Sequence, residues 1–509
     1  MFQGNPIGWL AVLGPGAVIA SITLGTGELI FSSRGGALFG YNILFVFVLI
    51  SLLKWGLVFA MSRHMVLTGV HPYTRMVSLP GPRGWFPLML LLIASLTTPV
   101  WTAFFPGILG NLIAIITDTQ NAFNGAAQYL WGIGFLFTVV MLTFLGGYTI
   151  LEKVQITIVG VMILSAIFSL IMYGPDWLAM LKGGMIPSSL KYPPWLPEKH
   201  PEISKYSEWV ETTRYIGVIG GAGFDYLAYT SWLREKHWGW AGVGEATTTD
   251  LEKAALDPQD FSRGWVIAPA IDCAVSFLLV VLFSAVFVAA GAIVLGPNQQ
   301  IPNGDNFLEM QSTFVAGIHP WMKPVYFVGA FLTLFGTLYG TLEIAITVCR
   351  EIVQAIHRDY AVHNQQRLRK IAVLWCSAGA TLILVWSFYL VYSGRGDTSV
   401  LIKLMTPANL FTGVLSCGIL CFLMPWIDRR FLPHPLRMHI TLLGLNVISG
   451  GIFLFLGIKG YWDAHDPSPG APIYTKRWFA IGGILAMLIV SLLLAKVLEK
   501  RRLNKNITA

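Results

Sequence analysis

Charged residues are scarce in this chain. Only 12% of its 509 residues are charged, whereas 55% are hydrophobic, and soluble globular domains carry roughly twice that charged share. Apolar runs of roughly 20 residues recur along the whole length, which is the length that spans a lipid bilayer. We therefore predict an integral membrane protein with the bilayer as its partner. Lys and Arg cluster in short loops, so the net charge of +8 does not indicate a nucleic-acid partner.

Cysteine and catalytic motifs are also lacking. The chain has five cysteines, and their spacing matches no zinc motif and predicts no disulfide. No nucleophile–base motif or nucleotide-binding loop is present, so we expect no enzymatic activity and no cofactor. The N-terminus lacks a basic region ahead of its apolar segment, and we expect no cleavable signal peptide.

Two apolar segments carry the same interruption. The first contains Gly25-Thr26-Gly27-Glu28, and the second contains Gly220-Gly221-Ala222-Gly223-Phe224-Asp225-Tyr226. In both, glycines weaken a helix and a carboxylate follows at once. Ionisable groups inside membrane spans are costly and usually functional. Paired broken helices in the two halves of a chain indicate the binding site of a transporter.

The apolar runs predict twelve spans, and the two breaks fall in spans one and six, five spans apart. A repeat unit with an odd number of spans must have the opposite membrane orientation from the next unit. The pattern therefore predicts an all-α polytopic protein of the LeuT type, with a 5+5 inverted repeat plus two extra helices. We expect the first repeat (spans 1–5) at 1–174, an ordered external loop at 175–212, the second repeat (spans 6–10) at 213–427, and spans 11–12 with the tail at 428–509. Prolines at 99, 106 and 407 are expected to interrupt spans three and ten.

The loops that follow even-numbered spans hold most of the basic residues. By the positive-inside rule this places both termini in the cytoplasm, with the protein integral to the cell (inner) membrane. We expect a monomer.

Short motifs in the first seventy residues resemble the Nramp divalent-metal permeases. They are Gly14-Pro15-Gly16, Ser21-Ile22, Gly40-Tyr41 and Thr68-Gly69, and the twelve-span plan also fits that family. The resemblance implies the family's fold and a divalent cation as substrate.

The two breaks depart from the family's pattern. Where the family has Asp-Pro-Gly-Asn in span one, this chain has Gly25, Thr26, Gly27 and Glu28; where it has Met-Pro-His-Asn in span six, this chain has Gly223, Phe224, Asp225 and Tyr226. The family's metal-binding Asp and Met are therefore replaced. Its acidic residues of span three have no counterpart between Trp85 and Phe105, and its span-ten Gln falls on Met405. This is the pattern of a divergent branch.

The candidate site consists of residues at the two breaks. Glu28 and Asp225 are candidate metal ligands, and each is also suited to cap a half-helix. The other candidate substrate-binding residues are Gly25, Thr26, Gly220, Gly223 and Tyr226. Asp272 and Glu343 lie inside later spans and either couple an ion or form structural pairs with Lys54 or Lys403. Arg34 is expected to extend toward the outer interface.

Two functions remain open from the sequence. The first is secondary transport of a hard divalent cation such as Mg²⁺ or Mn²⁺, because an all-oxygen site suits such ions, with weak or absent proton coupling. The alternative is transport of a small organic solute, an amino acid or organic acid, at the same breaks, with Phe224, Tyr226 and Tyr229 as aromatic contacts.

Overall fold

The chain folds as a bundle of long helices. The computed structural model describes residues 14–23, 25, 31–145, 174–302, 319–395, 400–463 and 477–507, together with single positions within 153–172 and 310–316. Among these residues there are helices and no strands, and nine helices are long and apolar enough to cross a membrane. The unbroken long helices are α4 (Ile43–Thr68), α6 (Trp85–Ile116), α7 (Ala127–Leu145), α17 (Ile267–Ala290), α19 (Met322–Ile356), α21 (Gln365–Tyr392), α24 (Ile440–Asp463) and α25 (Arg477–Ile507).

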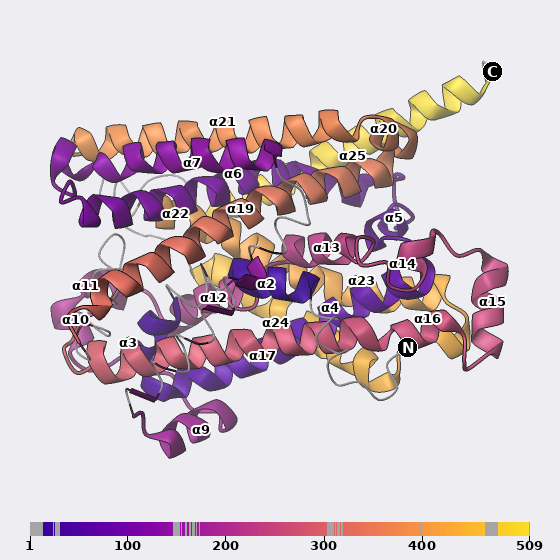
Figure 1. The fold of residues 1–509 in the computed structure, drawn as a ribbon. Coiled ribbons are helices and arrows are strands. Elements are labelled where there is room, and N and C mark those ends of the chain that lie inside the picture. Colours follow the sequence, from indigo (N-terminus) through magenta and orange to yellow (C-terminus); the bar gives the residue numbers. More distant parts are fainter. Residues whose placement is uncertain are drawn as a thin grey trace.

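Three spans are divided into shorter helices. Span one comprises α2 (Pro15–Thr23) and α3 (Ser33–Phe39), and span six comprises α12 (Glu208–Val218) and α13 (Gly223–Trp232). Span ten comprises α22 (Val400–Asn409), the π-helix η6 (Leu410–Leu415) and α23 (Ser416–Phe431). The predicted fold class and the break in span six are confirmed, whereas Thr26–Glu28, at the predicted break in span one, lie outside the described residues. The short helices α2 and α13 lie in the middle of the bundle, between α17 and α19 (Figure 1).

The prediction that prolines interrupt span three was wrong. Helix α6 continues through Pro99 and Pro106. A proline removes the N–H that would bind the carbonyl four residues earlier, and here the Trp375 indole of α21 donates to the Ser95 carbonyl at 2.7 Å instead. A neighbouring helix thus supplies the missing donor, which is how membrane helices tolerate proline. The prediction for span ten was wrong as well, because Pro407 lies inside α22 and the chain stays helical from Val400 to Phe431; the α-helix changes to a π-helix three residues beyond Pro407.

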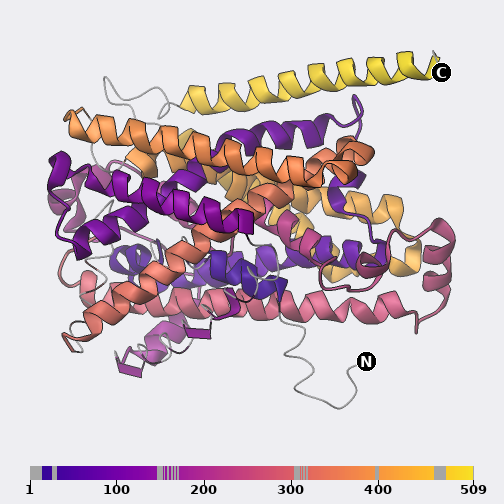
Figure 2. The same cartoon turned by 45° about the horizontal axis from the view of Figure 1, so that its top comes forward.

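Short helices cover the two ends of the bundle. Helices α9 (Trp177–Met185), α10 (Leu196–Lys199) and α11 (Pro201–Ser204) belong to the predicted ordered loop and lie at one end (Figure 1). At the other end are α5 (Pro72–Met76), α14 (Trp240–Val243), α15 (Thr248–Leu256), α16 (Phe261–Trp265) and α20 (Arg358–His363). The remaining elements are the 3₁₀-helices η2 (Gly40–Asn42), η3 (Ala122–Gly125) and η7 (His434–Leu436) and the π-helix η4 (Gly291–Leu295), which continues α17. Helix α25 runs along the outside of the bundle (Figure 2).

Candidate functional site

The break in span six is a non-helical segment of four residues between α12 and α13, with a turn at Ile219–Gly220 and extended backbone at Ala222. Ile219 leaves the helix with ψ of 126°, and Ala222 is extended with φ of −120° and ψ of 168°. Between them Gly220 and Gly221 have φ of +73° and +91°, a region that residues with a side chain rarely adopt. The glycines predicted to loosen this span therefore set its path, and the break covers 219–222, at the start of the predicted segment Gly220–Tyr226.

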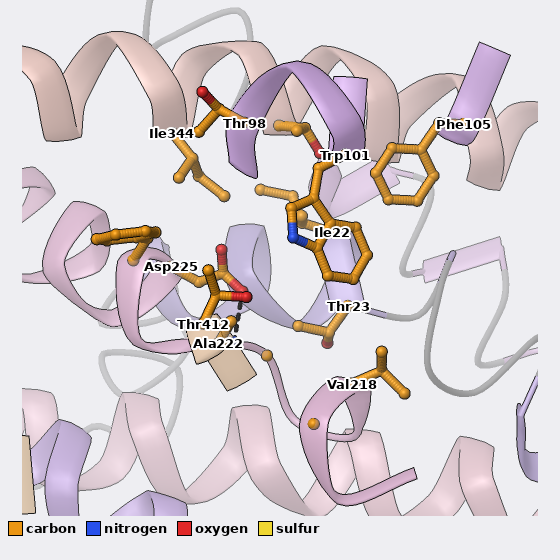
Figure 3. Close-up of a pocket in the computed structure, with 14 residues that line it drawn as sticks. Ile22, Thr23, Thr98, Trp101, Phe105, Val218, Ala222, Asp225, Ile344 and Thr412 are labelled. Carbon is orange, nitrogen blue, oxygen red and sulfur yellow. Dashed lines mark hydrogen bonds between the residues drawn. The ribbon is translucent and has the colours of Figure 1, made fainter. Parts of the chain in front are cut away.

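A cavity of about 60 Å³ lies beside this break. Its described lining comes from the end of α2, from α6, from α12 through α13, from α19 and from η6; the residues are Ile22, Thr23, Thr98, Trp101, Phe105, Gly217, Val218, Gly221, Ala222, Phe224, Asp225, Thr341, Ile344 and Thr412. Figure 3 shows Asp225, Thr412 and Thr23 around the same space, with the Trp101 indole beside them. The volume admits a few water molecules or one small, partly hydrated ion.

Asp225 is the one ionisable side chain in the described lining. It stands at the third position of α13, and its Oδ2 accepts a hydrogen bond from the Ala222 N–H at 2.6 Å. The carboxylate therefore caps the half-helix and borders the cavity at once. The predicted helix cap is present, and the role predicted for Asp225 as a metal ligand stays a prediction; a carboxylate has acceptor capacity beyond one hydrogen bond, so the two roles are compatible.

Four threonines complete the polar lining of the cavity. Their hydroxyls donate to carbonyls of their own helices: Thr23 to Ala20 at 2.9 Å, Thr98 to Ala94 at 2.6 Å, Thr341 to Thr337 at 2.8 Å and Thr412 to Ala408 at 2.9 Å. A hydroxyl whose proton is so engaged offers oxygen lone pairs to anything else nearby. The cavity thus presents one carboxylate and several oxygen acceptors.

The C-terminal end of α2 meets the break in span six at this cavity. A Cβ added to Gly221 would lie 2.9 Å from the Thr23 methyl group, so the end of α2 touches the non-helical segment. Gly25 packs against α19, where a Cβ would lie 1.9 Å from the Thr337 hydroxyl. The other predicted residues of the break in span one, Thr26 and Glu28, lie outside the described residues.

The remaining predicted residues of span six serve the break itself. The Tyr226 hydroxyl donates to the Gly220 carbonyl at 2.7 Å and to the Gly221 carbonyl at 3.0 Å. Gly223 packs against α23, where a Cβ would lie 2.4 Å from the Ser416 hydroxyl. Gly220, Gly223 and Tyr226 do not belong to the described lining of the cavity. Their neighbours Ala222 and Phe224 line it instead.

Comparison with known proteins identifies the family. A family model described as natural resistance-associated macrophage protein-like matches residues 16–463. The chain belongs to the Nramp family. Among curated proteins, none matches the chain. The Nramp family consists of metal-ion permeases, so the chain is an integral membrane transporter and not an enzyme.

Solved structures share the fold. A manganese transporter of Eremococcus coleocola, in complex with an aromatic bis-isothiourea substituted compound, is 16% identical, with 98% of this chain and 97% of that chain covered and a TM-score of 0.69. A mutant of the same transporter is 17% identical, with the same coverage and a TM-score of 0.67. At this identity the likeness describes the Nramp fold and carries no residue roles.

Asp272, the buried acid of α17, has partners that differ from those predicted. Asp272 accepts hydrogen bonds from the Gly14 and Gly16 N–H groups at 3.2 and 2.8 Å and from the Tyr229 hydroxyl at 3.0 Å. It therefore caps the N-terminus of α2 and joins it to α13. The predicted pairing with Lys54 or Lys403 was wrong, because the free N–H groups at the start of α2 take the carboxylate.

Glu343, the buried acid of α19, pairs with Arg369 of α21. The guanidinium donates two hydrogen bonds to it, at 2.5 and 3.1 Å, and one to the Thr143 carbonyl at 2.6 Å. A guanidinium forms such two-pronged pairs with a carboxylate better than an ammonium does. The predicted lysine partners were therefore wrong here too, although the structural role was among the alternatives.

The expectation for Arg34 was also wrong. Its side chain is 7% exposed and forms an ion pair with Glu211 of α12, and it donates to the Pro302 carbonyl at 3.0 Å. The pair joins α3 to α12. The half-helices α3 and α12 are thus linked by Arg34 and Glu211. The half-helices α2 and α13 are linked through Asp272.

Sequence reasoning missed most of the cavity wall. Thr98 and Trp101 of α6, Thr341 of α19 and Thr412 of η6 come from three further spans, and their spacing carries no signal for a shared site. Lys54 of α4 was also misjudged. Its ammonium donates to the carbonyls of Ile216, Ile219 and Gly221 at 2.9, 2.7 and 2.6 Å. The position of Lys54 in the middle of a 26-residue apolar helix indicated that its ammonium must have buried hydrogen-bond partners.

Proposed function

We propose that this Nramp protein carries a hard divalent cation, Mg²⁺ or Mn²⁺, through the cavity between spans one and six. The observation that carries the proposal is the donor set: Asp225 and four threonine hydroxyls supply oxygen, and the described lining contains no His, Cys or Met. Oxygen ligands suit Mg²⁺ and Mn²⁺, whereas sulfur and imidazole favour softer metals. A solved neighbour of the same fold is a manganese transporter.

The site needs more ligands than the described residues provide. Among those residues, no three His, Cys, Asp or Glu side chains gather around one point. We assign the remaining ligands to the break of span one, with Glu28 as the second carboxylate and Thr26 and the carbonyl near Gly25 as neutral oxygens. Water molecules fill the other positions, as they do around most protein-bound Mg²⁺.

Weak or absent proton coupling belongs to the same proposal. The sequence of α6 contains no acidic residue, and an aspartate stands where the family has a histidine in span six. Asp272 and Glu343 are both engaged in structural contacts. The cell-membrane location, the cytoplasmic termini and the monomeric state expected from the sequence are further parts of this proposal.

The alternative substrate is a small organic solute. Trp101, Phe105 and Phe224 line part of the cavity, and aromatic side chains commonly line organic ligand sites. The volume argues against it, since a cavity that binds benzene measures about 150 Å³ and this one measures about 60 Å³. A carboxylate at the cavity also repels the carboxylate of an amino or organic acid.

Calorimetry on the purified protein separates the two substrates. We expect Mg²⁺ or Mn²⁺ to bind saturably, and Asp225→Asn to weaken binding about ten- to a hundredfold, the worth of one interaction with a charged ligand. Glu28→Gln should act in the same way.

The matched control is Asp250→Asn. Asp250 occupies the same capping position in α15, where its carboxylate accepts the Thr247 N–H at 2.9 Å, but it lies outside the bundle. It should leave metal binding unchanged. Binding of an amino or organic acid, with no detectable Mg²⁺ or Mn²⁺ binding to the wild type, would replace the metal proposal by its alternative.

A further inference from the structure

The break in span six places three carbonyl oxygens around one point. They belong to Ile216, Ile219 and Gly221, at and just beyond the C-terminal end of α12. The chain leaves the helix at Ile219 and turns at Gly220, so these carbonyls are not consumed by a continuing helix. The end of a helix also carries partial negative charge. Such an arrangement is suited to a small monovalent cation.

The position is taken by the ammonium of Lys54. Its Nζ lies 2.9, 2.7 and 2.6 Å from the three oxygens, and an ammonium has three N–H donors to match them. The side chain is fully buried. It reaches the break from α4, and the aliphatic part of the side chain passes close to Gly220. Burying an ammonium is costly unless its hydrogen bonds are satisfied, so this position is built to hold a positive charge.

This charge lies directly behind the wall of the cavity. Gly221 lines the cavity with its backbone and gives its carbonyl to Lys54. Asp225, on the cavity side, is close enough to interact electrostatically with the ammonium. The positive charge therefore fixes the non-helical segment and offsets part of the field of the cavity carboxylate.

We propose that Lys54 is a tethered cation: it fills a monovalent-cation site formed by the three carbonyls, in place of a free Na⁺, K⁺ or ammonium ion. The protein then carries its own ion at the break, and its transport cycle needs none from solution. The inference is independent of the substrate, because it concerns the back of the cavity wall.

The test uses thermal unfolding of the purified full-length protein. Lys54→Ala removes the ammonium and leaves space, so methylammonium should bind there and raise the melting temperature saturably by at least about 2 °C, as expected for a ligand that binds only the folded state. NaCl, KCl and NH₄Cl, tested separately, identify which free ion fits. Lys54→Met is the matched control: it is also uncharged but fills the space, so the same ions should not stabilise it.

Two results would overturn the inference. One is a Lys54→Ala protein that no small cation stabilises, including one that stays unfolded in every salt. The other is measured on the wild type. If its substrate uptake requires Na⁺ or K⁺ and saturates with the concentration of that ion, a free ion and not Lys54 supplies the monovalent cation of the transport cycle. Uptake by the wild type that is unchanged in choline chloride, with rescue of the alanine variant, supports it.

Discussion

His71, next to α5, is held neutral by its hydrogen bonds and its burial. Its Nδ1 accepts the Tyr73 N–H at 3.2 Å, so Nε2 carries the proton and faces the Leu227 carbonyl at 3.0 Å. A proton on Nδ1 would face the Tyr73 N–H, so that two hydrogen-bond donors would point at each other. Burial, with the nearby Arg234 and Arg350, lowers the pKa of His71 from 6.5 to about 4, although Glu351 acts in the opposite direction.

This lowered pKa predicts a loss of stability in acid. Between pH 6.5 and 4 the unfolded chain binds a proton at His71 that the folded chain does not, so the free energy of unfolding falls as the pH falls, by at most about 3–4 kcal/mol. His71→Gln keeps a donor and an acceptor but does not titrate, and its melting temperature should fall less between pH 7.5 and 4.5. His439→Gln, at an exposed position, should behave as the wild type. Equal slopes for the wild type and His71→Gln would contradict the assignment.

The contacts of individual side chains were the features that the sequence predicted least well. Glycine followed by a carboxylate predicted the break of span six and the place of Asp225, because both depend on local backbone preferences. The partners of Asp272, Glu343 and Arg34 depend on which helices pack together, and a single sequence does not contain that information. For the same reason the threonines of the cavity could not be found.

At the scale of helices, the contact between α12 and η6 positions the cavity. A Cβ added to Gly413 would lie 2.0 Å from the Gly217 carbonyl, so the two backbones touch. Gly217 lines the cavity, and Thr412 lines it from η6. The π-helix in span ten thus turns a hydroxyl to the cavity at the point of closest approach, and such local widening of a helix is frequent at functional sites.

This contact predicts the effect of a methyl group. Gly413→Ala should separate α12 from η6, costing about 1–3 kcal/mol of stability as overpacked positions do and lowering substrate uptake by disturbing the cavity wall. Gly444→Ala in α24 is the control, because a Cβ there meets nothing within 4 Å. Melting temperature and initial uptake rate in proteoliposomes are the measurements. Wild-type values for Gly413→Ala would show that the close contact is not required.

Nine helices among the described residues are long and apolar enough to cross a membrane, as the apolar runs predict, because apolar length fixes where spans lie. The predicted bounds of the two repeats stay a prediction. Span three differed because proline was taken as an interruption, whereas Trp375 of another span replaces the lost donor at Ser95. A proline therefore predicts a missing N–H, and tertiary packing decides whether the helix ends there.

At the scale of the whole molecule, the links between half-helices describe two units. Asp272 holds α2 to α13, and the Arg34–Glu211 pair holds α3 to α12. The cavity lies where these units meet the backbone breaks.

The most direct test of the account is uptake by the purified protein in liposomes that contain a metal-sensitive and a pH-sensitive dye. We predict saturable entry of Mg²⁺ or Mn²⁺ with little or no internal acidification, at least about tenfold slower entry for Asp225→Asn, and wild-type entry for Asp250→Asn. Entry of neither metal into wild-type liposomes that take up an amino or organic acid would contradict the metal assignment. Metal entry with acidification in proportion would contradict the absence of proton coupling.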